Sequence, residues 1–233
     1  AEKGIVHCKS FYPLQKDSFV SLHAGTAANM VCAGATAVLT ETSAKYVDLY
    51  KKAAEKQVSS DKKLNGAEEK RDLHTAKNGT AWNYDEATRT IVFSGKSAHG
   101  STPEKGVNAL ESLLEFASMF DAGCKRAYEV LCLDENHLRE MRDETGLLTM
   151  SPDVAEIEDG ALAITTDIRF PATHTVEEVR EAFEKTGVKF EFLHYQKPLY
   201  NDPHGKLIST LMNVYNRHTG RNEKAIAIGG GTY

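Results

Sequence analysis

The stretch GLLTMSPDVAEIEDGALAITTDIRF, residues 146–170, predicts two β-strands joined by a tight turn. The turn is expected at Asp159-Gly160, a dipeptide typical of two-residue hairpin loops because both positions tolerate a positive φ. Successive side chains of a strand point to opposite faces, so Asp167 and Arg169 are expected on the face opposite to the apolar residues of the second strand. Those apolar residues are Leu162, Ile164, Ile168 and Phe170.

Segments on both sides of this hairpin alternate between strand and helix patterns. Further strands are expected at residues 17–22, 35–40, 188–195 and 224–228, and in a hairpin around Asp85-Glu86. Helices are expected at residues 43–58, 106–120 and 204–219, and after a capping box formed by Thr175 and Glu178. The hairpin connections favour an α+β fold with an antiparallel sheet and helices packed on one face. The order strand–helix–strand occurs twice, which indicates two similar lobes.

The composition is that of a globular protein of 233 residues, of which 41% are hydrophobic and 26% charged. A formal net charge of -5 argues against a nucleic-acid partner, because phosphate binding needs clustered lysine and arginine. No apolar run reaches the length of a membrane span, and the N-terminus lacks the apolar core of a signal peptide. The four cysteines form no C-x-x-C pair, so we expect reduced thiols and a cytoplasmic location.

A second stretch, FSGKSAHGSTPEKGVNAL at residues 93–110, contains a Gly-Lys-Ser that suggests a phosphate-binding loop. Such a loop needs a glycine five residues before Gly95, and Thr90 occupies that position. The expected helix also begins well after the lysine, so a phosphate loop is excluded. His99 remains as a candidate, because its small neighbours leave the imidazole accessible on a loop between a strand and a helix. A lone histidine is more often structural.

No other motif in the chain predicts a metal site or a nucleophile. The nine histidines form no H-E-x-x-H or H-x-H pattern, and Glu68-Glu69 lies in a polar run typical of a solvated surface. A G-x-S-x-G nucleophile elbow is absent. The run Gly229-Gly230-Gly231 could bring its backbone close to a ligand, although on its own it indicates a tight turn.

Five segments, taken together, resemble the lid region of peptidase V-like dipeptidases. These enzymes belong to the zinc metallopeptidase superfamily that also contains carnosinases and aminoacylases. The matching segments occur in the family's order: AANMV (27–31), GKSAHGSTPEKGVNAL (95–110), ALAITTDIRFP (161–171), LYNDPHGKLISTLMNVYNRHTG (199–220) and AIAIGGGTY (225–233). The resemblance is poor at residues 55–80 and 121–145.

The resemblance implies a role for each matching position in the hydrolysis of dipeptides. His99 would stabilise the oxyanion that forms at the scissile carbonyl, and Asn29 would help to hold the same substrate. Arg169 would bind the C-terminal carboxylate of the dipeptide, a task suited to a planar guanidinium. The glycines at 229, 230 and 231 would contact the substrate through their backbone. One departure lies beside Asn29, where Cys32 replaces the family's proline.

The resemblance also implies that part of the active site is outside this chain. The family uses two zinc ions, whose ligands flank the matching segments, and none of those ligands falls on a matching residue here. We therefore expect residues 1–199 to form the lid, with lobes near 1–120 and 146–199, and residues 200–233 to be a piece of the α/β catalytic domain. On this interpretation the chain alone is inactive and binds no catalytic zinc.

Three functions agree with these observations. The first is the lid of a zinc dipeptidase whose substrates carry a free amino terminus. The second is a non-enzymatic binding or dimerisation module of the same fold, because a shared fold does not prove a shared function. The third is an acyl-amino-acid amidohydrolase of the same superfamily. The sequence predicts neither the preferred dipeptide nor the oligomeric state.

Overall fold

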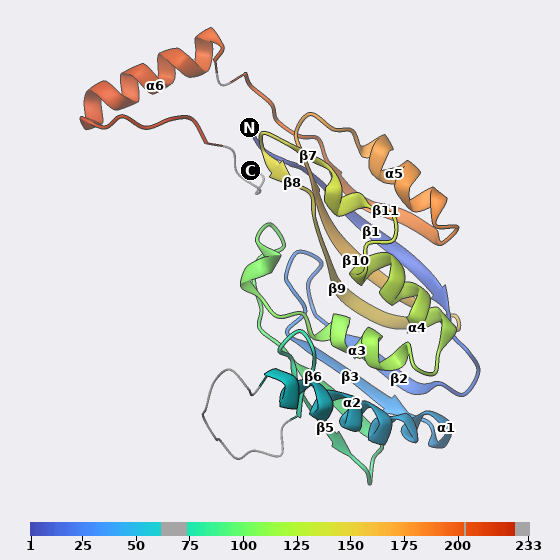
Figure 1. The fold of residues 1–233 in the computed structure, drawn as a ribbon. Coiled ribbons are helices and arrows are strands. Elements are labelled where there is room, and N and C mark those ends of the chain that lie inside the picture. Colours follow the sequence, from blue (N-terminus) through green and yellow to red (C-terminus); the bar gives the residue numbers. More distant parts are fainter. Residues whose placement is uncertain (62–73, 203, 227–233) are drawn as a thin grey trace.

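The structure is a computed structural model that describes residues 1–61, 74–202 and 204–226. Its central element is a nine-stranded sheet with the order β11-β1-β10-β9-β2-β3-β6-β5-β4 (Figure 1), in which every neighbouring pair is antiparallel. The strands are β1 (Gly4–Pro13), β2 (Phe19–Ala24), β3 (Gly34–Leu39), β4 (His74–Thr75), β5 (Ala81–Asp85), β6 (Thr90–Ser94), β9 (Thr149–Glu158), β10 (Ala161–Phe170) and β11 (Lys189–Gln196). A separate small hairpin joins β7 (Arg142–Asp143) to β8 (Gly146–Leu147). The predicted α+β class with an antiparallel sheet is confirmed.

The β9–β10 hairpin forms as the sequence predicts. Asp159 and Gly160 have φ angles of 48° and 77°, the left-handed values that a tight hairpin turn requires. The apolar residues of β10 are buried on one face, and Asp167 and Arg169 lie on the other. The register shifts between Thr165 and Thr166, where Asp153 is the extra residue of a β-bulge on β9.

Strand β1 was not predicted, although it is ten residues long and central in its half of the sheet. It pairs with β10 on one side and β11 on the other, so the N-terminus lies among strands that follow residue 146 in the sequence. The proposed division into lobes at 1–120 and 146–199 therefore stays a prediction, with β1 placed in the second half of the sheet.

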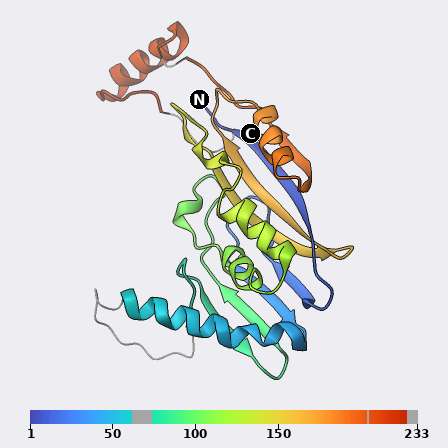
Figure 2. The same cartoon turned by 45° about the vertical axis from the view of Figure 1, so that its right-hand side comes forward.

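The helices α2–α5 cover one face of the sheet, as expected, and leave the opposite face open (Figures 1 and 2). The helices and helical turns are α1 (Glu41–Ala44), α2 (Tyr46–Asp61), η1 (Pro103–Lys105), α3 (Ala109–Ala117), α4 (Ala122–Ala127), the π-helical turn η2 (Tyr128–Cys132), η3 (Leu138–Glu140), α5 (Val176–Lys185) and α6 (Lys206–Thr219). The predicted capping box of α5 is present, since Thr175 and Glu178 satisfy each other's backbone N–H groups. Asn108 caps α3 by accepting from the N–H groups of Leu110 and Glu111.

An aromatic cluster fills the core under α2 and α3. The Tyr50 ring lies 5.2 Å from the Trp82 ring and 5.2 Å from the Phe116 ring, and Phe93 completes the group at 6.1 Å from Tyr50. Trp82, Phe93 and Phe116 are at most 1% exposed. Edge-to-face and tilted contacts of this kind stabilise the core beyond the burial of apolar area.

Helix α6 stands apart from the sheet (Figures 1 and 2), and none of its residues is buried. One of its faces nevertheless carries large apolar side chains that are 42–62% exposed, namely Leu207, Leu211, Val214 and Tyr215. Gly220 ends the helix with a left-handed φ of 69°, the conformation typical of a glycine C-cap. The expected strand at 224–228 does not form over residues 224–226, and its remaining residues lie outside the described ranges.

The two halves of the sheet meet at a short seam. Strand β2 pairs with β9 through only two residue pairs, His23 with Glu156 and Ala24 with Ala155. Beyond these pairs the chain leaves the sheet in a loop over residues 25–33, which returns to begin β3. A second loop, over residues 95–108, connects β6 to α3. These two segments, called here the 25–33 loop and the 95–108 loop, occupy the gap that the short pairing leaves.

Candidate functional site

His99 lies on the 95–108 loop with its side chain exposed. Its Nδ1 accepts the backbone N–H of Ser101 at 3.1 Å and lies 2.8 Å from the Ser101 hydroxyl. A backbone N–H can only donate, so Nδ1 carries no proton and the neutral ring carries its proton on Nε2. The loop therefore fixes His99 in the tautomer that offers an Nε2–H donor.

Asn29 lies beside His99, although 70 positions separate them in the sequence. The Gly100 N–H donates to the Asn29 carbonyl at 2.7 Å, and the Val31 N–H donates to the Ala98 carbonyl at 2.9 Å. These bonds form an isolated antiparallel bridge between Met30 and His99. The 25–33 loop and the 95–108 loop thus hold each other in register, and the structure brings these two candidate residues together.

Arg169 is only 3% exposed and forms a two-pronged ion pair with Asp167 on the same strand. The distances are 2.8 Å from Nε to Oδ1 and 2.9 Å from Nη2 to Oδ2. Side chains two positions apart on a strand share a face, which explains why they pair. Asp167 therefore occupies the edge of the guanidinium that Nε and Nη2 form.

Gly100 connects the ion pair to the two loops. A Cβ at this position would lie 2.0 Å from Oδ2 of Asp167 and 3.1 Å from the Asn29 carbonyl oxygen. Only glycine allows so close an approach between the 95–108 loop and the buried pair. His99, Asn29 and Arg169 therefore converge at one place, while the glycines at 229, 230 and 231 lie outside the described residues.

Two polar residues near this site were not predicted. Asp153 is fully buried, accepts a 2.6 Å hydrogen bond from Ser151, and has its pKa raised to about 9 by burial. The 25–33 loop packs against the backbone of this residue, since a Cβ on Gly25 would lie 1.8 Å from the Asp153 carbonyl oxygen. His7 lies opposite Asp167 on the neighbouring strand β1, and burial lowers its pKa. Both were missed because the segments that pack against them, β10 for His7 and the 25–33 loop for Asp153, lie far away in the sequence.

A metal site needs several His, Cys, Asp or Glu side chains close together. Within residues 1–61, 74–202 and 204–226, no three His, Cys, Asp or Glu side chains are grouped to hold a metal ion. Glu68-Glu69 falls in a segment that the structure does not describe. In the same described ranges, no helix has both the length and the apolar character to cross a bilayer.

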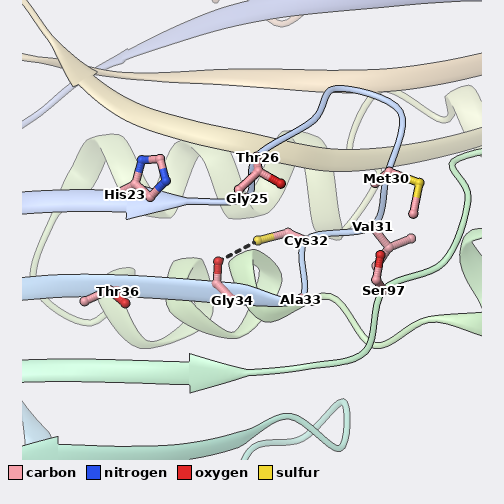
Figure 3. A pocket seen from close by; sticks show the side chains of 10 residues that line it. All are labelled: His23, Gly25, Thr26, Met30, Val31, Cys32, Ala33, Gly34, Thr36 and Ser97. Carbon is pink, nitrogen blue, oxygen red and sulfur yellow. Dashed lines mark hydrogen bonds between the residues drawn. The ribbon is translucent and has the colours of Figure 1, made fainter.

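A pocket of about 300 Å³ opens beside the candidate residues (Figure 3). The 25–33 loop supplies most of its wall, including Met30, and Ser97 of the 95–108 loop contributes from the other side. Its floor lies where the loop leaves and re-enters the sheet, since the Gly25 N–H donates to the Gly34 carbonyl at 3.0 Å. Cys32 donates its thiol to the same carbonyl at 3.1 Å. The described lining residues include no aspartate, glutamate, lysine or arginine.

Parts of the chain are similar in sequence to known proteins. Residues 87–186 match the model of the peptidase dimerisation domain. The chain is 27% identical over 165 residues to a protein of Staphylococcus epidermidis named "Putative dipeptidase", a match that covers 64% of the chain and 35% of that protein. It is 24% identical over 163 residues to the Beta-Ala-Xaa dipeptidase of Lactobacillus delbrueckii subsp. lactis, with the same coverage. An uncharacterized metallohydrolase of Methanocaldococcus jannaschii is 27% identical over 160 residues, covering 60% of the chain and 38% of that protein.

The matches therefore extend over only about a third of the length of these relatives. Among solved structures, the aminoacylhistidine dipeptidase of Vibrio alginolyticus aligns with a TM-score of 0.41 at 12% identity, covering 98% of this chain and 51% of that one. The sequence relatives and the domain match confirm the resemblance to peptidase V-like dipeptidases. The matched domain contains β6, His99, α3, β9, β10 and α5.

Proposed function

We propose that the chain is the lid of a metal-dependent dipeptidase and that its open sheet face covers the substrate. The convergence of His99, Asn29 and Arg169 on one side of the seam carries this proposal. The relatives that are named as dipeptidases support it.

In this proposal His99 donates its Nε2–H to the oxyanion that develops at the scissile carbonyl. A preorganised donor of this kind stabilises a transition state by ~3 kcal/mol. The hydrogen bonds from Ser101 support the role, because they hold the ring in the donor tautomer before substrate arrives. Asn29 holds the same substrate from the neighbouring loop.

Arg169 binds the C-terminal carboxylate of the dipeptide, and Asp167 holds the guanidinium in place for that contact. Two-pronged pairing makes the orientation of an arginine specific. The glycine run at 229–231 contributes backbone contacts to the substrate.

The described residues do not form a metal site, so the residues of this chain act on the substrate and not on a metal ion in this proposal. We propose that two zinc ions are held by segments of a longer protein, where they would activate the attacking water. The name of the archaeal relative, a metallohydrolase, supports dependence on a metal.

Residues 1–199 form the lid in this proposal, and residues 200–233 begin a catalytic domain. The exposed apolar face of α6 supports the boundary, because large apolar side chains in a row are normally covered by another part of the protein. The expected cytoplasmic location and the expected absence of a nucleic-acid partner stay predictions.

Self-association is the second candidate function. The match to a peptidase dimerisation domain favours it. An acyl-amino-acid amidohydrolase would share the same lid, and its activity on acylated amino acids would distinguish it from a dipeptidase.

The test compares a longer protein that contains this chain with residues 1–233 alone. The longer protein should hydrolyse dipeptides with a free amino terminus, lose activity with a chelator and regain it with zinc. The isolated chain should be folded and inactive. A longer protein with no activity on dipeptides, but a stable dimer through this domain, would favour the second candidate.

A further inference from the structure

The pocket beside Met30 adjoins the residue proposed to face the reacting carbonyl. Met30 pairs with His99 across the bridge between the two loops, and Ser97 precedes His99 by two positions. Figure 3 shows that the lining residues come from β2, the 25–33 loop and the start of β3, with His23 at one end and Ser97 at the other. The pocket therefore adjoins the loop that carries His99.

The pocket lining contains no aspartate, glutamate, lysine or arginine among the described residues, and its titratable members are the Cys32 thiol and the His23 imidazole. Burial raises the pKa of the Cys32 thiol to about 11, so this residue carries no charge at neutral pH. Thr26 and Thr36 offer hydroxyl groups, while Met30 and Val31 offer apolar surface. A lysine or arginine side chain entering this space would lose water without gaining a carboxylate partner, and among the described lining residues His23 alone could pair with a carboxylate.

The size of the pocket suits one side chain. Its volume of about 300 Å³ is at the lower end of the range of ligand pockets, which is ~300–1,000 Å³. A single amino-acid side chain therefore fits within this volume.

We propose that this pocket binds one uncharged side chain of the dipeptide and so sets the side-chain preference of the enzyme. The inference rests on the proposed function, since it uses the position of His99 relative to the scissile carbonyl. It adds a substrate class, namely dipeptides with an uncharged residue next to the His99 loop.

Gly34 allows a sharp test. A Cβ added there would meet no atom within 4 Å, although Gly34 lines the pocket. Its φ is not in the left-handed region, so a larger residue is compatible with the start of β3. The series Gly34→Ala, Gly34→Val and Gly34→Leu therefore fills the pocket step by step with little risk to folding.

The variants would be made in the longer protein and assayed with glycine, alanine, leucine, aspartate and lysine at either position of the dipeptide. The wild type should favour uncharged side chains at one of the two positions. Gly34→Leu should reduce kcat/KM for leucine at that position by at least about tenfold relative to glycine, since one methylene changes selectivity ~10–200-fold. The effect should increase from alanine to leucine.

Val38→Leu is the matched control, because Val38 lies on the same strand and the same face outside the pocket. It should leave the ratio of leucine to glycine substrates unchanged. A Gly34→Leu protein that is folded and active with an unaltered ratio would overturn the inference, as would a wild type that prefers charged side chains at both positions. A wild type that hydrolyses no dipeptide would instead refute the proposed function.

Discussion

The helix-covered face and the open face of the sheet bury different groups. Under the helices lie Trp82, Phe93 and Phe116, in contact with one another. On the open face, close to the seam, lie the buried pair Asp167 and Arg169. The comparison teaches that stability and binding chemistry can be assigned to opposite faces of one sheet, and substitutions on each face should have different consequences.

The largest effect on stability is expected on the helix-covered face. Trp82→Ala should lower the free energy of unfolding by about 4 kcal/mol, because it removes a buried aromatic side chain and leaves a cavity. Denaturant unfolding of the chain measures this loss, and Trp82→Phe should recover part of it. A loss below about 1 kcal/mol would show that the aromatic cluster does not support the fold.

On the open face, Asp167→Ala should lower the free energy of unfolding by about 3 kcal/mol, because it removes the carboxylate that forms a two-pronged ion pair with the buried Arg169. Asp167→Asn should cost less, since the amide oxygen still accepts from the guanidinium. In the longer protein both changes should raise KM for dipeptides more than they lower kcat, whereas Trp82→Phe should alter neither. If Trp82→Phe raised KM as much as the Asp167 substitutions do, stability and binding would not be separated between the two faces of the sheet.

A smaller effect on the open face depends on pH. The pKa of Asp153 is about 9 in the folded chain and ~3.9 in an unfolded one. At a pH between the two pKa values, the Asp153 carboxyl is protonated in the folded chain and ionised in the unfolded chain. The stability that Asp153 contributes is therefore fully present below the pKa of the unfolded chain, and it is lost as the pH rises toward the pKa of the folded chain. Asp153→Asn removes this dependence and keeps the acceptor for Ser151.

Unfolding measured at pH ~5 and ~8.5 should therefore show that Asp153→Asn becomes more stable than the wild type as pH rises. The matched control is Asp85→Asn, which alters an exposed carboxyl in a turn. A difference between Asp153→Asn and wild type that stays constant with pH would mean that Asp153 is ionised in the folded chain.

Local signals in the sequence predicted much of the fold. The Asp159-Gly160 turn and the Thr175 capping box each specify a structure within a few residues, and both form. Strand β1 was missed because polar residues occur on both of its faces, with His7 on one and Ser10 on the other. Its hydrophobic alternation is therefore weak, and its place in the sheet is fixed by partners on β10 that are 148 to 166 positions away.

The candidate site was predictable only through the resemblance. His99, Asn29 and Arg169 carry no local signal of a shared site, and their proximity arises from the bridge between the loops and from the close approach of Gly100. The pocket at Gly34 could not be predicted, because its walls come from segments that meet only in the folded chain. The roles of the three candidate residues stay predictions.

The most direct test of the central claim is the turnover of His99→Ala in the longer protein. We expect kcat for dipeptides to fall about 10²–10³-fold while metal content and the free energy of unfolding remain those of the wild type. His137→Ala, which alters another exposed histidine, should leave kcat unchanged. A His99→Ala protein that is folded, loaded with metal and nearly as active as the wild type would contradict the account.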